Sequence, residues 1–152
     1  PWAKDETISR HTYNARSETA HDKPSFREAW RQGRYGLVLV DHFYEPHYGE
    51  GRALRWKIGL TSGEPFGIAS LWERWTSPQT GEVVVSFSML TVNADEHPVM
   101  KQFHKPQDEK RTPLIIRPDL HQAWLEASPT EAKQLMDWHH MPDLAAEPAP
   151  KA

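Results

Sequence analysis

The 152-residue chain contains no cysteine. Disulfides, thiolate metal sites and a cysteine nucleophile are therefore excluded within these residues. The chain also has no apolar run near the roughly 20 residues needed to span a bilayer, and it has no basic-then-apolar leader of the secretory kind. We therefore expect a soluble protein that makes no membrane contact and is located in the cytoplasm.

The chain also lacks an excess of positive charge. Its 18 Lys and Arg residues are outnumbered by 21 Asp and Glu residues, which gives a formal net charge of −3 and a pI near 6.3. Bulk charge therefore gives no sign of nucleic-acid binding, and any phosphate contacts would need a local basic face. The apolar content of 38% is low for a globular protein. Seven Trp, five Phe and four Tyr offset that deficit, because each buries a large area.

Hydrophobic patterning predicts a β-rich domain. The clearest strand is 83–92, which is rich in β-branched residues. Residues 35–40 form an apolar run typical of a buried strand, and 54–60 alternate with period two. Further strands are expected at 66–72 and 114–116, and short helices at 25–33, 93–102, 118–125 and 130–138. Several strands with a few short helices predict an α+β fold that is mostly antiparallel.

Polar and turn-forming residues predict the ends of these elements. Ser25 with Glu28 matches a capping box, and Asp119 is the expected cap of the helix at 118–125. Pro46 is expected to stop the pairing of the strand before it, and residues 47–51 are expected to form a polar turn.

The two ends of the chain differ from the rest of the sequence. Residues 143–152 are rich in Ala and Pro, so we expect a disordered tail there and a folded domain over residues 1–142. The chain opens at Pro1 without a Met. We therefore expect it to be a piece of a longer protein.

Asn14, Arg16 and Glu18 place an amide, a guanidinium and a carboxylate close together ahead of the first predicted helix. Alternate residues of an extended segment face the same side, so Asn14 and Arg16 would point together. An arginine there can bind a phosphate bidentately, and an amide can hold a reacting group in place. The same residues also fit a loop buttress in which Glu18 satisfies Arg16.

Glu45 and the histidines are the other candidates for chemistry. Glu45 follows an apolar strand, where desolvation would raise its pKa towards that of a useful acid or base. A carboxylate that faces solvent at a strand end is the alternative. Nine histidines invite a metal site, but no His-x-x-x-His or His-Glu-x-x-His spacing is present. We expect no metal and no cofactor.

A run of mixed charge surrounds His104. Its cations are Lys101, Lys105, Lys110 and Arg111, and they alternate with Asp108 and Glu109. Such a run is usually a solvated loop. Beside Arg16, however, it would form the local basic surface that net charge hides.

Seven short stretches of the chain fit one known family when they are taken together. They are Pro1-Trp2-Ala3-Lys4, Asn14–Thr19, Lys23–Phe26, Asp41–Glu45, Gly67–Glu73, Phe87–Thr91, and His104–Pro106 followed by Arg111–Pro113. In this order and spacing, from residue 1 to about 125, they resemble the SOS response-associated peptidase (SRAP) family, also known as DNA abasic-site shielding proteins.

The resemblance implies a β-rich α+β fold, a monomer, and binding to single-stranded DNA that contains abasic sites. Members of the family act in the DNA damage (SOS) response. They trap the ring-opened aldehyde of an abasic site as a thiazolidine, through an N-terminal cysteine exposed by self-processing. The implied enzyme is therefore an SRAP peptidase and lyase-type DNA–protein cross-linking enzyme.

Residue by residue, the resemblance assigns catalytic roles to Asn14, Glu45 and His104. Glu45 would transfer protons during sugar ring opening and Schiff-base formation, and His104 would assist the same transfers. Asn14 would position the reacting N-terminus. Arg16 and Arg111 match arginines that bind DNA phosphates.

The chain also departs from the family pattern. A compact His-x-Arg-Met-Pro motif is stretched here, with residues 105–110 between His104 and Arg111. The cysteine is absent, and so is the part of the family domain that precedes these residues. The alternative function is a non-enzymatic module that binds single-stranded DNA or another partner. A weaker alternative is a His-rich metal hydrolase.

Overall fold

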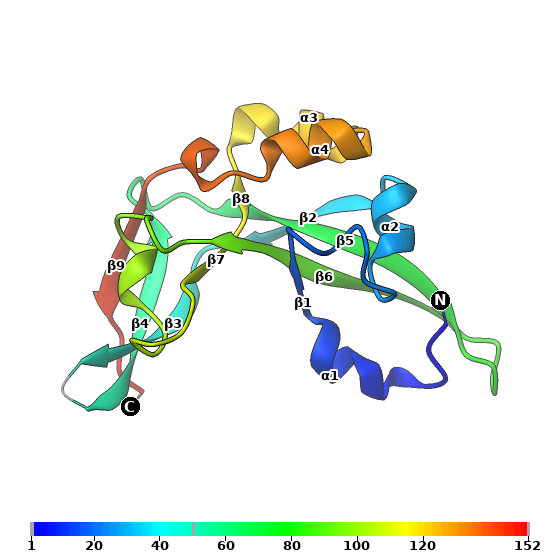
Figure 1. The fold of residues 1–152 in the computed structure, drawn as a ribbon, viewed down its shortest axis with the longest axis horizontal. Coiled ribbons are helices and arrows are strands. Elements are labelled where there is room, and N and C mark those ends of the chain that lie inside the picture. The colour runs from blue at the N-terminus through cyan, green and yellow to red at the C-terminus, as the bar shows by residue number, and fades with distance from the viewer. Residues whose placement is uncertain (1, 50, 152) are drawn as a thin grey trace.

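The structure is a computed structural model that describes residues 2–49 and 51–151. Its strands belong to two sheets (Figure 1). The larger sheet has the order β1-β6-β5-β2, with β7 pairing β6 and β8 pairing β5. The smaller sheet has the order β3-β4-β9.

Most neighbouring strands are antiparallel, and β1 and β6 are the parallel pair. The larger sheet contains β1 (Asn14–Arg16), β2 (Tyr35–Val40), β5 (Phe66–Thr76), β6 (Val83–Asn93), β7 (Arg111–Pro113) and β8 (Ile115–Ile116). The smaller sheet contains β3 (Phe43–Gly49), β4 (Arg52–Leu60) and β9 (Leu144–Pro148). The predicted mostly antiparallel α+β fold is confirmed.

Short helices cover one face of the larger sheet. They include α2 (Arg27–Arg31), α3 (His121–Leu125) and α4 (Pro129–Leu135), and α1 (Ser9–Thr12) lies near the N-terminus (Figure 1). Single 3₁₀ turns occur at Glu6–Ile8, Met100–Gln102, Pro118–Leu120 and Trp138–His140. None of the helices in the described ranges is long and apolar enough to cross a membrane.

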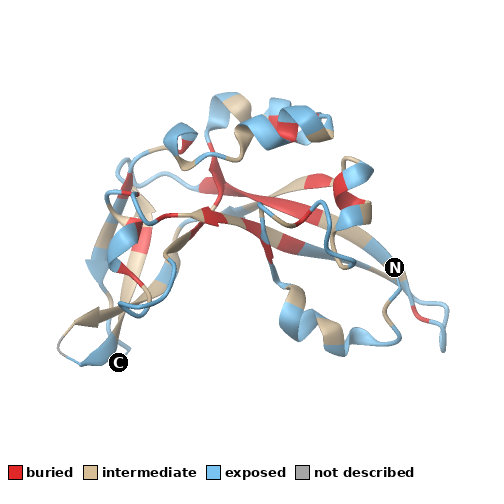
Figure 2. Cartoon of the chain, in the orientation of Figure 1, coloured by how far each residue is buried: buried red, intermediate tan, exposed pale blue. Residues whose placement is uncertain are grey.

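Aromatic side chains join these helices to the sheet. The ring of Tyr35 on β2 lies 5.5 Å from that of Trp30 and 4.9 Å from that of Trp124. The Trp124 indole donates a hydrogen bond to the Gly36 carbonyl. Figure 2 shows that buried residues concentrate along the middle of the larger sheet and on the helix faces turned towards it. These aromatic side chains thus supply core contacts and offset the low apolar content of the sequence.

Three expectations about element ends are wrong. Ser25 does not cap α2, which begins at Arg27 with Phe26 at the cap position and no side-chain cap. Asp119 accepts hydrogen bonds from Arg117 instead of capping a helix. Pairing continues through Pro46 to Gly49. Because β3 is the edge strand of its sheet, the missing proline N–H costs no ladder bond on the outer side.

A strand lies where a disordered tail was predicted. Residues Leu144–Pro148 form β9 and pair with β4. The Ala149 N–H donates to the Arg55 carbonyl at 2.8 Å, and the Arg55 Nε donates to the Ala149 carbonyl at 2.7 Å. Backbone pairing to an existing sheet needs no hydrophobic pattern, so the Ala/Pro-rich composition gave no sign of it.

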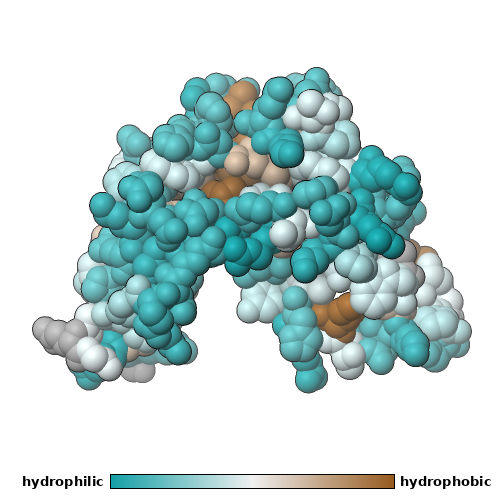
Figure 3. Space-filling model, in the orientation of Figure 1, coloured by the Kyte–Doolittle hydropathy of each residue, from teal (hydrophilic) through white to brown (hydrophobic). Residues whose placement is uncertain are grey.

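The molecule is hollowed between two legs in the space-filling view (Figure 3). One leg holds the smaller sheet, and the other holds α1 and the N-terminal segment (Figure 1). The larger sheet joins the legs, and the rim of the hollow is mainly hydrophilic in this view (Figure 3). This arrangement sets β1, which holds Asn14 and Arg16, apart from β3, which holds Glu45.

Candidate active site

Glu45 and His104 form a close pair on the smaller sheet. Glu45 lies on β3, opposite Trp56 of β4. The outer edge of β3 holds the His104 segment, because the His104 N–H donates to the Pro46 carbonyl at 2.9 Å. This contact brings the His104 Nε2 within 3.5 Å of the Glu45 Oε2. The side chains of Glu45 and His104 are only 16% and 28% exposed, respectively.

Three aromatic rings pack together next to this pair, because Trp56 lies opposite Glu45 and Phe103 precedes His104. His47 stacks on Trp56 with ring centres 4.9 Å apart, and Phe103 meets both rings edge-on at 6.0 Å. Sequence reasoning missed all three residues. The available signal was strand alternation, because residues two apart on β3 share a face and His47 therefore lies on the side of Glu45.

Burial changes the acid–base properties of both groups. It raises the pKa of Glu45 to about 7 and lowers the pKa of His104 below its ordinary value. Near neutral pH both the protonated and the ionised form of the Glu45 carboxyl group are therefore accessible, while the imidazole of His104 is neutral. Although the two atoms lie within ion-pair distance, the pair is better described as a carboxylic acid facing a neutral base. Such a pair suits general acid–base catalysis.

The same place holds unsatisfied polar atoms and an unusual backbone conformation. Among the described residues, the buried His104 Nε2 and Trp56 Nε1 have no hydrogen-bond partner. His104 also has a φ of 63°, in the left-handed region that non-glycine residues rarely adopt. Buried polar atoms without partners and left-handed backbone each cost free energy, and such features cluster at functional sites. Glu45 and His104 are therefore the centre of the candidate site.

Arg16 and Glu109 form a second, exposed contact. The Arg16 Nη2 donates to the Glu109 Oε2 at 2.5 Å, and their side chains are 55% and 37% exposed. The other oxygen of Glu109 accepts from the Asn93 amide at 3.0 Å. Arg16 projects from a short strand whose middle residue, Ala15, is buried.

Arg111 is held much more tightly than Arg16. Its two Nη atoms donate to the two carboxylate oxygens of Glu18, each at 2.9 Å, and it also donates to the carbonyl and hydroxyl oxygens of Thr91. Burial alone would raise the pKa of Glu18, but the hydrogen bonds from Arg111, a backbone hydrogen bond and the positive charges of Arg111 and Arg16 together lower that pKa. The buttress interpretation placed Glu18 on Arg16, and that pairing is wrong. Glu18 pairs with Arg111, and Arg16 pairs with Glu109.

The structure brings together some of the predicted site residues and separates others. Glu45 contacts His104, and Arg111 lies 3.6 Å from Glu109, the partner of Arg16. Asn14 is exposed on β1 and shares the exposed side of that strand with Arg16. β1 and β3 lie in different sheets on the two sides of the hollow (Figures 1 and 3). No hydrogen bond joins Asn14 to Glu45 or His104 among the described residues.

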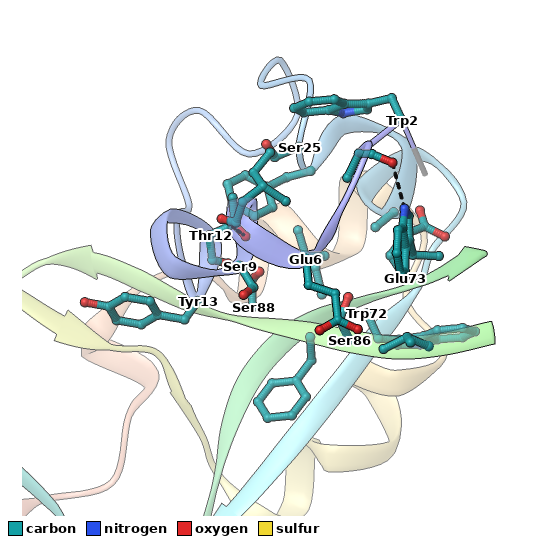
Figure 4. A pocket seen from close by; sticks show the side chains of 18 of the residues that line it. Trp2, Glu6, Ser9, Thr12, Tyr13, Ser25, Trp72, Glu73, Ser86 and Ser88 are labelled. Carbon is teal, nitrogen blue, oxygen red and sulfur yellow. Dashed lines mark hydrogen bonds between the residues drawn. The ribbon is translucent and has the colours of Figure 1, made fainter. Parts of the chain in front are cut away.

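A cavity of about 360 Å³ lies between the N-terminal segment and strands β5 and β6 (Figure 4). Trp2, Trp72, Trp75 and Phe87 are among its lining residues. Trp75 and Ala3 both line the cavity, and the Trp75 indole donates a hydrogen bond to the Ala3 carbonyl at 2.8 Å. None of the five predicted site residues lines it. No three His, Asp or Glu side chains in ranges 2–49 and 51–151 lie close enough to hold a metal ion.

Relatives of known name match most of the chain. Abasic site processing protein YoqW of Bacillus subtilis is 32% identical over 136 residues, which cover 89% of this chain and 57% of the relative. Abasic site processing protein HMCES of Rattus norvegicus is 30% identical over 121 residues, which cover 61% of this chain and 34% of the relative. The chain thus spans little more than half the length of the bacterial relative.

Solved structures and a family model match the whole chain. A crystal structure of a Bordetella bronchiseptica protein has a TM-score of 0.87 at 31% identity, covering 99% of this chain and 73% of that one. A Bacteroides thetaiotaomicron protein has a TM-score of 0.84 at 23% identity, with 99% and 65% covered. The model of the SOS response associated peptidase (SRAP) family matches residues 1–152. The chain therefore belongs to the SRAP family.

Proposed function

We propose that this chain supplies the acid–base site of a protein that binds single-stranded DNA and covalently traps abasic sites. The buried contact of Glu45 with His104 carries the proposal, because it offers a proton donor and acceptor that work near neutral pH. The names of the relatives, abasic site processing proteins, support the substrate class. The chain spans 57% and 34% of these two relatives, so the activity of the whole protein is part of the proposal.

The proposed reaction joins an amine and a thiol to an aldehyde. Protonation of the ring oxygen of the abasic sugar and loss of its hydroxyl proton open the ring to the aldehyde. An N-terminal amine then adds to the aldehyde carbon, and the adduct loses one water to form a Schiff base. A neighbouring thiol adds to the imine carbon and closes a thiazolidine. The thiol comes from outside these residues, because the chain has no cysteine.

Glu45 performs the proton transfers of this scheme. In its protonated form it donates a proton to the sugar ring oxygen and later to the departing hydroxyl group, and each time it takes a proton back from the reacting amine or hydroxyl. A pKa of about 7 makes both directions accessible at neutral pH. His104 contacts the carboxyl group and exchanges the proton with it.

Asn14 and Arg16 act from the other side of the hollow. Asn14 holds the N-terminal amine through its side-chain amide, and Arg16 binds a phosphate of the single strand. Both are exposed on the same side of β1. The Arg111 side chain is only 14% exposed. It therefore contributes to phosphate binding only through the part of its guanidinium that Glu18 does not cover.

The test is cross-linking of the complete gene product to a single-stranded oligonucleotide with one abasic site, followed on denaturing gels. Glu45→Gln keeps the shape of the side chain and removes its proton, so we expect cross-linking to slow by at least about tenfold. His104→Asn serves as a second variant, because asparagine tolerates the left-handed backbone and lacks the imidazole.

Each outcome has a clear meaning. If the unmodified gene product forms no cross-link, the trapping function is abandoned. If it binds single-stranded DNA without cross-linking, the non-enzymatic DNA-binding module replaces it. A normal rate in Glu45→Gln would remove Glu45 from the mechanism while leaving the substrate class intact.

A further inference from the structure

We propose that Glu109 competes with DNA phosphate for Arg16, so that the chain holds its own affinity for single-stranded DNA below what Arg16 would otherwise give. The inference rests on the proposed function in taking single-stranded DNA as the ligand. Its basis is the contact between the Arg16 Nη2 and the Glu109 Oε2 at 2.5 Å. A carboxylate and a phosphate present similar pairs of oxygens to a guanidinium, so both seek the same N–H groups.

Hydrogen bonds hold the loop that carries Glu109, and they keep its carboxylate next to Arg16. The Asn93 amide donates to the Glu109 Oε1 at 3.0 Å. The N–H of the next residue, Lys110, donates to Asp95 at 2.8 Å, and the Lys110 ammonium donates to the Lys105 carbonyl at 2.7 Å. These bonds anchor Glu109 and Lys110 to neighbouring segments and place the Glu109 carboxylate against Arg16.

The contact is weak enough for DNA to displace. Both side chains are more than a third exposed, and exposed ion pairs change an equilibrium by only about 1.5- to 5-fold. Arg111 differs, because it holds Glu18 with two N–H groups and contacts Thr91 with its side chain largely buried. Arg16 is therefore the guanidinium that exchanges a protein carboxylate for a phosphate.

Removal of the Glu109 charge tests this competition. The complete gene product and its Glu109→Gln variant are titrated against fluorescent, unmodified oligothymidylate, and binding is followed by anisotropy. We expect Glu109→Gln to bind about 1.5- to 5-fold more tightly, the range for an exposed ion pair. The glutamine side chain can still accept the hydrogen bond from Asn93, so the loop stays in place.

Asp108→Asn is the matched control. Asp108 belongs to the same loop and forms no ion pair among the described residues, so this variant removes the same charge without freeing Arg16. It should tighten binding less than Glu109→Gln does. In an Arg16→Gln background, the effect of Glu109→Gln should fall to that of Asp108→Asn.

Salt dependence gives a second measurement. Salt screens the exposed ion pair of Arg16 with Glu109, so the affinity gained by Glu109→Gln should shrink as salt rises, and its slope of log affinity against log salt should be steeper than that of Asp108→Asn or the unmodified chain. Equal affinities and slopes for Glu109→Gln, Asp108→Asn and the unmodified chain would overturn the inference while leaving DNA binding intact. Absence of binding by all three would overturn both.

Discussion

Two polar groups of the molecule differ in burial and in pairing. One is the pair of Glu45 with His104, and the other is the group formed by Arg16, Arg111, Glu18 and Glu109. The first pair is buried among aromatic rings, and its imidazole Nε2 lacks a hydrogen-bond partner in the described part of the chain. In the second group both guanidinium groups are paired with carboxylates, with distances down to 2.5 Å. Burial without partners moves a pKa towards neutrality, whereas pairing keeps the charged form.

This difference in burial and pairing gives the two groups different chemical roles. The Glu45 carboxyl group can gain or lose a proton near pH 7, which is a requirement for proton transfer and costs stability. The paired carboxylates of Glu18 and Glu109 have lowered pKa values and stay ionised. They position arginines and do not move protons.

The largest expected effect on stability comes from removing the buried acid. The pKa of Glu45 is about 7 in the folded protein and 4.5 in a model peptide, so the folded state binds more protons between these values. Stability is therefore lost as pH rises from about 4.5 to 7, and the loss is complete above 7. We expect Glu45→Gln to raise the free energy of unfolding at pH 8 by roughly 2–3 kcal/mol and to change it little at pH 4.

Chemical denaturation at pH 4, 6 and 8 measures this effect. Glu64→Gln is the control, because Glu64 is exposed in the turn between β4 and β5. Its stability should follow that of the unmodified chain at each pH. Parallel pH profiles for Glu45→Gln and the unmodified chain would show that Glu45 carries no buried charge penalty.

The second expected effect on stability comes from removing the guanidinium of Arg111. Arg111→Gln removes two charge-assisted hydrogen bonds to Glu18 and the contacts to Thr91, so we expect a loss of about 2 kcal/mol in the free energy of unfolding. Arg117→Gln is a matched control, because Arg117 also makes two hydrogen bonds to one carboxylate, that of Asp119, but both side chains are about half exposed. That variant should change stability by less than about 0.5 kcal/mol. Equal losses would mean that burial adds nothing to the Arg111 contact.

Much of the fold could be predicted because its strands carry their own pattern. Tyr35–Val40 matches the predicted strand residue for residue, and Val83–Asn93 exceeds the prediction by one. The errors fall where tertiary context decides. Pro46 continues in β3 because that strand is an edge, and β9 forms because β4 offers an unpaired backbone.

The candidate site was less accessible to sequence reasoning. Glu45 and His104 are 59 residues apart, and only the family resemblance joined them before the structure did. Their roles remain a prediction. The partners of Arg16 and Arg111 were not predictable, because Glu109 and Glu18 lie 93 residues away from the arginines that they bind. Charge type alone cannot choose among several nearby carboxylates.

The smallest expected effect on stability comes from Arg16, and it distinguishes Arg16 from Arg111 most directly. Arg16→Gln removes one exposed hydrogen bond to Glu109, so we expect the free energy of unfolding to change by less than about 0.5 kcal/mol. The small change should vanish in 1 M salt, where the Debye length is only about 3 Å. The loss in Arg111→Gln should persist, because the Arg111 side chain is largely buried and also donates hydrogen bonds to Thr91. Thermal and denaturant unfolding at low and high salt measure both variants side by side. A loss in Arg16→Gln as large as that in Arg111→Gln would show that Arg16 is a structural strut, and a strut is not free to exchange Glu109 for a phosphate.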